Sequence, residues 1–156
     1  MNDFEIKFCE DSILIDDIQN EYLLLFIIHG TATVTLTTET NYLSEKDLLI
    51  INWNRHFKLQ TVPGTLMLII SIRAGLFRDL THKRLPYFEC CSSQHSSVKY
   101  EHLRYLIYDL LGECALNMKE MNAKKLSILY KICDCLICSF MLSDKQPLIE
   151  TSDERL

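Results

Sequence analysis

The clearest pattern of hydrophobic and polar positions lies between residues 21 and 59. Three apolar runs, Tyr22–Ile28, Ala32–Leu36 and Leu48–Ile51, are separated by short polar segments. The first run is apolar almost throughout, which is typical of a strand buried on both faces or of a short buried helix. In the second run threonines alternate with apolar residues, and this favours a strand. The pattern therefore predicts a β-hairpin followed by a third strand.

Alternating runs on both sides of this region predict further strands. Phe4–Phe8 suits an edge strand with one buried side, and Ser12–Ile18 suits a second short strand. Phe57–Val62 and Thr65–Ile72 predict two more, joined by a tight turn at Pro63–Gly64. So many short, closely spaced strands favour a small sandwich or barrel.

Beyond Arg73 the periodicity becomes helical. Gly75–Thr81 allows one or two helical turns, and an apolar stripe at helical spacing begins at Val98. Asn122 suits the N-cap of another helix, because its side-chain oxygen can accept a backbone N–H. We therefore predict a barrel over 1–90, a loop over 91–97, a two-helix element over 98–142, and a polar tail or linker over 143–156.

The second long helix carries two apolar rows, whereas a helix that packs on one side needs only one. One row is formed by Ile128, Ile132 and Cys135. The other row has the 3-4-3-4 spacing of a coiled-coil seam. The helix is either enclosed in the core of one chain or shared with a second copy, and we expect the second arrangement. The predicted homodimer seam is Leu126, Leu129, Cys133, Leu136 and Phe140.

Composition narrows the class of protein. The chain has 156 residues, 48% of them hydrophobic and 24% charged, enough for one good core. It has no apolar window long enough for a membrane span, and its acidic N-terminus does not resemble a signal peptide. We therefore expect a cytoplasmic protein. The seven cysteines lack zinc-finger spacing and accompany no export signal, so we interpret them as free, mostly buried thiols.

Charge is distributed unevenly. The net charge of −5 argues against nucleic-acid binding by this chain alone. Carboxylates dominate residues 1–21, whereas basic side chains dominate residues 55–84. We expect the acidic N-terminal segment to lie near the basic region.

Motifs for catalysis are missing from the sequence. It contains no glycine-rich phosphate loop, no GxSxG and no HExxH. A histidine at a strand end, such as His29 or His56, is more often a structural group than a ligand. We therefore predict no catalytic residues.

The order of several short motifs is informative. EYLLLFIIHG at Glu21–Gly30, the Thr-rich strand, Tyr42–Leu43, KDLLIIN at Lys46–Asn52 and then Arg55-His56 resemble the cupin-type sensor domain of bacterial AraC-type transcription regulators. The following ISIRAGLFRDL, PYFEC and the pair of helices resemble that family's next section, so the resemblance covers nearly the whole chain. It implies a mainly β fold with α: a cupin-like, double-stranded jelly-roll β-barrel followed by an antiparallel two-helix dimerisation element.

The sequence departs from that family pattern at three places. Lys46 stands where the family usually has glycine before Asp47, so the turn can differ in shape. Trp53 and Asn54 replace the expected proline neighbourhood. The His-x-His pair of metal-binding cupins is missing, and His56 alone matches a metal-binding position, so we expect neither metal nor cofactor.

The resemblance implies an effector-sensing, dimerising domain. A small molecule, often a sugar or metabolite, would bind inside the barrel, and DNA would be bound only through helix-turn-helix units that this chain does not contain. Aromatic side chains can stack on a sugar, and Arg or His can bind hydroxyls or an anion. The candidate pocket residues are Tyr22, Leu24, Phe26, Thr33, Thr35, Tyr42, Trp53, His56 and Arg73.

Two alternatives stay open. One is a small cupin enzyme, such as a sugar isomerase or epimerase, in which His56 would work with Tyr22, Tyr42 or Glu21 as acid–base partners. The other is a purely dimerising cupin domain without a ligand, in which large apolar side chains along Leu23–Ile28 and Leu66–Ile72 fill the barrel.

Overall fold

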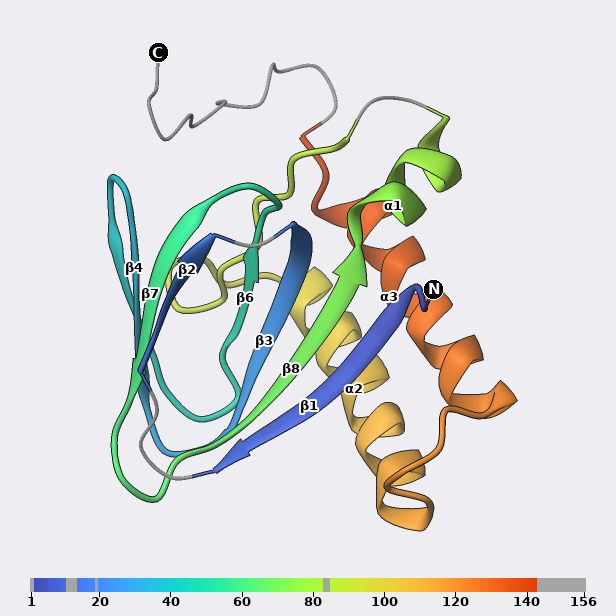
Figure 1. The fold of residues 1–156 in the computed structure, drawn as a ribbon, viewed down its shortest axis with the longest axis horizontal. Helices are drawn as coiled ribbons and strands as arrows, with labels where there is room; N and C mark the ends of the chain where they lie inside the picture. The colour runs from blue at the N-terminus through green and yellow to red at the C-terminus, as the bar shows by residue number, and fades with distance from the viewer. Residues whose placement is uncertain (1, 11–13, 19, 83–84, 143–156) are drawn as a thin grey trace.

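Two four-stranded antiparallel sheets and three helices make up the part of the chain that this computed structural model describes, residues 2–10, 14–18, 20–82 and 85–142. We call the sheet with strand order β1-β8-β3-β6 the inner sheet and the one with order β2-β7-β4-β5 the outer sheet. The inner sheet lies between the outer sheet and the helices (Figure 1). The strands are β1 Phe4–Glu10, β2 Leu14–Ile18, β3 Glu21–His29, β4 Ala32–Leu36, β5 Thr40–Leu43, β6 Leu48–Ile51, β7 His56–Thr61 and β8 Leu66–Arg73.

Strand β3 explains why the inner sheet takes the central position. Its successive side chains point to opposite faces, and both faces are buried. Leu23, Leu25 and Ile27 pack toward the outer sheet, whereas Tyr22, Leu24 and Phe26 pack toward the helices. The prediction of a strand buried on both faces is confirmed.

The predicted hairpin between the first two runs is wrong. β3 pairs with β6 and β8, whereas β4 pairs with β5 and β7, so the two strands belong to different sheets. The physical reason lies in their faces: β3 needs cover on both sides, while the threonine face of β4 suits solvent. Gly30 makes the crossing with φ of 95°, and a Cβ there would lie 2.7 Å from the Cα of Thr65.

Strand β1 is an edge strand, as predicted, and packs Phe4 into the core. The acidic N-terminal segment also lies against the basic region, as predicted. Arg73 forms an ion pair with Asp3 at 2.7 Å, and Asp16 of β2 lies opposite Lys58 of β7.

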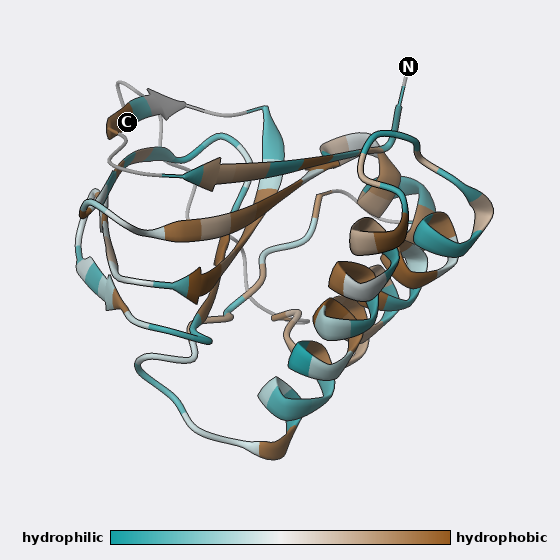
Figure 2. Cartoon of the chain, turned by 90° about the horizontal axis from the view of Figure 1, so that it is seen from below, coloured by the Kyte–Doolittle hydropathy of each residue, from teal (hydrophilic) through white to brown (hydrophobic). Residues whose placement is uncertain are grey.

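Three helices follow the strands: α1 Ala74–Thr81, α2 Val98–Leu116 and α3 Ala123–Ser139. Asn122 caps α3 as predicted, because its side-chain oxygen accepts the Lys125 N–H at 2.9 Å. α2 and α3 are antiparallel, since Lys99 near the start of α2 donates to the Ser139 carbonyl at the end of α3. Figure 2 shows the helix ribbons alternating between brown and teal, whereas several strands carry longer brown runs.

The predicted dimer seam on α3 needs a correction. Leu129, Cys133 and Leu136 are fully buried within one chain, and Phe140 is nearly so. Of the five seam residues only Leu126 is exposed. Ile132 and Cys135 of the second row are buried as well. Both rows serve the core because α3 contacts α2 and the inner sheet together, so four of the five seam residues are not accessible to a second copy in this fold.

The predicted loop over 91–97 begins within a segment that runs alongside β6 and is hydrogen-bonded to it. The Ile50 N–H donates to the Cys90 carbonyl, and the Ser92 N–H donates to the Leu48 carbonyl, both at 3.0 Å. The predicted tail over 143–156 lies outside the described residues. Among the described residues, no helix has the length and apolar content needed to cross a membrane.

Candidate functional site

Apolar side chains of the described residues meet between the two sheets. Thirteen buried residues form one apolar cluster there, almost all aliphatic: Leu23, Leu25, Ile27, Ala32, Val34, Leu43, Leu49, Ile51, Phe57, Leu59, Met67, Ile69 and Cys91. Close packing of this kind provides few polar groups to orient a sugar-like ligand. A candidate site therefore has to be sought at the ends of the barrel.

Three of the predicted pocket residues face the helices. Tyr22, Leu24 and Phe26 are fully or almost fully buried in the helix-side core. The Tyr22 hydroxyl donates to the Pro86 carbonyl, and burial raises the pKa of this phenol far above its ordinary value. These three residues hold the inner sheet against the helices and do not face the barrel interior.

The other six predicted pocket residues are dispersed. Thr33, Thr35 and Tyr42 lie on the outward face of the outer sheet, where Tyr42 is 73% exposed. Trp53 packs against the helix-side core. His56 pairs with Asp16 at 2.6 Å on the surface, and Arg73 pairs with Asp3. The structure does not bring the nine residues together.

The acid–base set of the enzyme alternative is also separated. Tyr22 lies in the inner sheet and faces the helices, whereas Tyr42 and His56 lie on the outward face of the outer sheet. Among the described residues, no three His, Cys, Asp or Glu side chains come together in a way that could hold a metal ion.

A polar cavity of about 120 Å³ lies at one mouth of the barrel. Its walls come from the end of β4, from β6 and the turn after it, and from the segment 87–95, which forms a cover. We call this cavity the mouth pocket. None of the nine predicted pocket residues lines it; its polar lining residues are Glu39, Asn52, Arg55, Tyr87, Glu89, Gln94 and His95.

The cover is fixed by side chains from the barrel. The Asn52 amide donates to the Phe88 carbonyl at 3.0 Å and accepts the Phe88 N–H at 2.8 Å. Arg55 donates to the Tyr87 hydroxyl at 2.8 Å. The two Asn52 bonds are buried and the Arg55 bond is partly buried, so the barrel holds the cover in this position by bonds that are largely shielded from water.

Asn41 lies beside the mouth pocket and is 1% exposed. Its side-chain oxygen accepts from the Gln94 amide, but its Nδ2 has no hydrogen-bond partner among the described residues. A buried N–H left without a partner costs about 1–3 kcal/mol. The mouth pocket is thus bordered by a buried donor that an added acceptor would stabilise.

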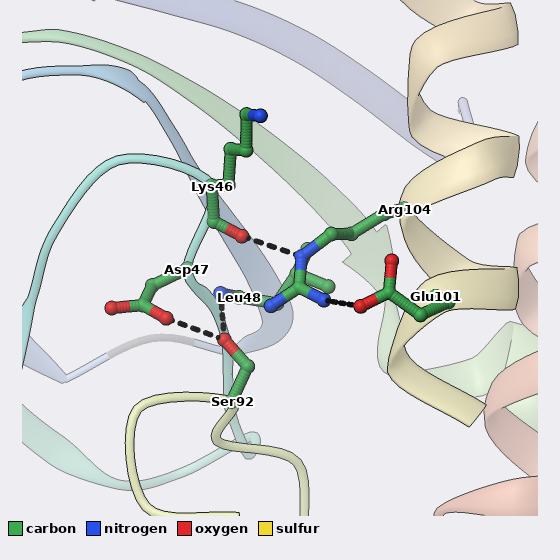
Figure 3. Close-up of polar contacts among 6 residues, drawn as sticks. All are labelled: Lys46, Asp47, Leu48, Ser92, Glu101 and Arg104. Carbon is green, nitrogen blue, oxygen red and sulfur yellow. Dashed lines mark hydrogen bonds and ion pairs between the residues drawn. The ribbon is translucent and has the colours of Figure 1, made fainter. Parts of the chain in front are cut away.

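Polar contacts also connect the cover to helix α2 (Figure 3). Ser92 Oγ accepts the Leu48 N–H and donates to Asp47 Oδ1, both at 2.8 Å. Next to them, Arg104 of α2 donates to the Lys46 carbonyl at 2.8 Å and pairs with Glu101. We call these contacts the polar bridge. A displacement of the cover would reach α2 through the 46–48 turn.

Lys46 in this bridge has φ of 73°, in the left-handed region that favours glycine. The departure at Lys46 therefore changes the residue while the turn keeps a glycine-type backbone. Sequence reasoning named Asn52 and Arg55 within motifs but not as site residues, and it did not name Asn41 or Gln94. The one available signal was Asn52, a polar residue directly after the apolar strand β6; nothing in the polar stretch around Gln94 marks it.

Comparison with known proteins places the fold in context. No protein-family model matches the chain, and no curated protein matches its sequence. The crystal structure of the AraC-like transcriptional activator CuxR is similar with a TM-score of 0.61 and 10% identity, covering 94% of this chain and 55% of that one. A conserved Streptococcus pyogenes protein of unknown function has a TM-score of 0.43 and 18% identity, covering 47% of this chain and 67% of that one. A cupin superfamily protein from Desulfitobacterium hafniense has a TM-score of 0.40 and 17% identity, covering 44% of this chain and 64% of that one.

At 10% identity the likeness to the AraC-like activator shows the fold, over both the barrel and the helices. The two antiparallel sheets followed by helices confirm the predicted fold class, a cupin-like β-barrel with a helical element after it. The chain spans 55% of the length of that activator.

Proposed function

We propose that this chain is the effector-sensing part of an AraC-type transcription regulator, which binds DNA through helix-turn-helix units that this chain does not contain. The observation that carries the proposal is the fold likeness to an AraC-like activator over 94% of this chain, helices included. The net charge of −5 agrees with a domain that leaves DNA binding to another part of the protein.

The mouth pocket is the effector site in this proposal. Its charged and amide side chains suit a small, polar, hydroxyl- or carboxylate-bearing molecule. At about 120 Å³ it is smaller than the roughly 300–1,000 Å³ of usual ligand pockets. The effector must therefore be very small, or the cover must move outward to admit it.

Outward movement of the cover on effector binding would be transmitted to helix α2 through the polar bridge. Ser92 belongs to the cover and bonds to Asp47 and Leu48, and Arg104 of α2 holds the same turn through the Lys46 carbonyl. A ligand can shift such an equilibrium only by its difference in affinity for the two arrangements. The polar bridge is the element through which we expect the effector to act.

The apolar cluster between the sheets favours a second candidate, a cupin-like domain that only mediates assembly and has no effector. Its apolar cluster leaves little reason for a ligand to enter between the sheets. Under this candidate the mouth pocket is only the imperfectly packed end of the barrel.

Calorimetry with a panel of sugars and small organic acids separates the two candidates. We expect one class to bind, and we expect His95→Ala and Gln94→Ala to weaken its binding about tenfold by removing hydrogen bonds to it. His102→Ala is the matched control, since His102 is an exposed histidine on α2 outside the mouth pocket. If no compound binds, or if all three variants bind equally well, the mouth pocket is not an effector site.

A reporter experiment tests regulation. The chain is fused to a DNA-binding domain from another regulator, and the response to the bound compound is measured. Arg104→Met is expected to keep calorimetric binding and lose most of the response, because it cuts the polar bridge outside the pocket. An unchanged response in Arg104→Met would contradict this route. Two helix-turn-helix patterns in the reading frame beyond Leu156 would support the proposal as a whole, and a stop codon there would contradict it.

A further inference from the structure

We propose that the free edge of β1 pairs with β1 of a second copy of this chain, antiparallel and centred on Ile6, so that two inner sheets join into one. This surface lies apart from the mouth pocket, and the inference does not rest on the proposed function. It replaces the α3 seam, four of whose five residues are buried within one chain.

The first observation is that β1 has a neighbour on one side only. It pairs with β8 and ends the inner sheet, as Figure 1 shows. At the other end of the same sheet, the edge of β6 is covered by the segment around Cys90 and Ser92. Among the described residues, nothing pairs with the outer edge of β1. Such an edge presents N–H and C=O groups that can pair with another strand.

The register shows which backbone groups point outward. The Arg73 N–H donates to the Asp3 carbonyl at 2.9 Å, so Asp3 and then every second residue of β1 bond toward β8. The N–H and C=O groups of Phe4, Ile6 and Phe8 therefore project from the free edge. These are the groups that would pair with a second copy.

The sequence of β1 is self-complementary in that register. Antiparallel pairing about a two-fold axis at Ile6 places Phe4 opposite Phe8 of the second copy, in hydrogen-bonded pairs. It also places Glu5 opposite Lys7 of the second copy, twice over, in non-hydrogen-bonded pairs, where side chains approach most closely. A shift of the centre to Lys7 would place Lys7 opposite itself and Glu5 opposite Cys9. A shift to Glu5 would place Glu5 opposite itself and Lys7 opposite Asp3, whose carboxylate is already paired with Arg73. Charge thus selects the register centred on Ile6, and the contact has the isologous symmetry of a closed dimer.

A groove of about 430 Å³ receives the second copy in this arrangement. It lies along residues 2–6 and is walled by the α2–α3 connection and the first turns of α3. The apolar residues on the helix side of the groove, Met118, Met121, Leu126 and Tyr130, are 37–61% exposed. Because the strands run antiparallel, the Phe8 end of the second copy lies over the Phe4 end of the first, where the groove is. Phe8 also points to the helix side of its own sheet, so its ring is directed toward this groove.

Sedimentation velocity on four proteins tests the charge register: the unmodified chain, Glu5→Lys, Lys7→Glu and the double variant. We expect the unmodified chain to dimerise, and each single variant to raise the dimer dissociation constant at least about tenfold, because two opposite-charge pairs become like-charge pairs. The double variant restores opposite charges and should return to within about threefold of the unmodified chain. Glu5 and Lys7 are exposed, so circular dichroism and the melting temperature should hardly change.

Ile6→Pro tests the backbone contact. The lost N–H faces away from β8, so the chain's own sheet keeps its hydrogen bonds, and proline is tolerated on an edge strand. We expect a folded monomer. Should this variant fail to fold, the charge series decides alone. A monomeric unmodified chain at the highest soluble concentration, or a dimer whose dissociation constant ignores all three charge variants, overturns the proposal.

Discussion

The two sheets of this barrel differ in how many of their faces are buried. The inner sheet covers one face with the outer sheet and the other with helices, and β3 is buried along nearly its whole length. The outer sheet buries one face only, and β7 alternates strictly between exposed and buried residues. The comparison shows that the helices cover one of the two buried faces of the inner sheet, and we infer that they belong to the same folding unit.

The two cores on either side of the inner sheet also differ in chemistry. The barrel core is almost wholly aliphatic, with Phe57 as its aromatic residue. The helix-side core is rich in aromatic rings that meet edge to face, such as Tyr22 with Phe77 at 4.9 Å and Tyr100 with Phe140 at 5.0 Å between ring centroids. Such contacts add about 0.5–1.5 kcal/mol beyond area burial. Directional contacts therefore fix the helices on the sheet, whereas the barrel core depends on aliphatic packing.

The largest predicted effect on the free energy of unfolding comes from substitutions that test whether α3 belongs to the core or to a dimer surface. Leu129→Glu or Leu136→Glu places a carboxylate in the helix-side core and should cost more than about 4 kcal/mol, enough to unfold most of the chain. Urea unfolding measures it. Leu126→Glu, at a 37% exposed position, is the matched control and should cost less than about 1 kcal/mol. A folded, monomeric Leu129→Glu would instead return the seam to a dimer interface.

Neighbouring leucines of β3 allow the two cores to be compared directly. Leu24 faces the helices and Leu25 faces the outer sheet, and both are fully buried. We expect Leu24→Ala and Leu25→Ala each to cost about 3 kcal/mol through lost burial and a cavity. Amide hydrogen exchange should accelerate in α2 and α3 for the first variant and in β4 and β7 for the second.

Additivity completes this test. If the cores are energetically separate, the urea-derived costs of the two variants should add within about 0.5 kcal/mol in the double variant. A larger coupling, or the same exchange pattern in both variants, would mean that the inner sheet transmits packing changes between its faces.

The sequence predicted the number of buried faces of each strand well. It predicted less well which strands or helices pack against those faces. The apolar run of β3 indicated two buried faces, and the alternation of β4 indicated one. Neither pattern says which strand pairs with which, because any two adjacent strands satisfy the same periodicity. The hairpin prediction failed for this reason, and Tyr22, Leu24 and Phe26 were placed in a pocket although they face helices.

The site was harder to predict than the fold. Mouth-pocket residues such as Asn52, Arg55 and Gln94 come from segments that are distant in sequence, and only the folded cover brings them together. The α3 seam failed differently. Heptad-like spacing shows that two faces are apolar, but it does not show whether the second face meets the same chain or another.

Alkaline pH should weaken the helix-side core. Burial, and then the charges of Asp134 and Asp3, raise the pKa of the Cys133 thiol from 9.0 to about 12. Above pH 9 the unfolded chain loses this proton while the folded chain keeps it. The free energy of unfolding should therefore fall by about 1.4 kcal/mol per pH unit between pH 9 and 12 from this thiol.

Urea unfolding at several pH values checks this slope. Cys133→Ala should make it shallower by about 1.4 kcal/mol per pH unit, and the rest of the slope should remain because burial also raises the pKa of other thiols, such as Cys90 and Cys135. An equal slope in Cys133→Ala would assign the alkaline instability to other groups.

The smallest predicted effect concerns the turns that carry the chain between the sheets. At Gly30 the chain leaves the inner sheet with φ of 95°, and at Lys46 it returns from the outer sheet with φ of 73°. Glycine adopts this backbone without strain, while lysine pays about 1–2 kcal/mol for it. Because glycine also costs about 0.5–1 kcal/mol of unfolded-chain entropy, Lys46→Gly should raise the free energy of unfolding by about 0.5–1 kcal/mol in urea unfolding. Asn54→Gly, at φ of 60°, is the matched control and should gain less, since asparagine tolerates this region better than lysine. If Lys46→Gly instead destabilises the chain, the lysine side chain contributes more to the turn between β5 and β6 than its backbone strain removes.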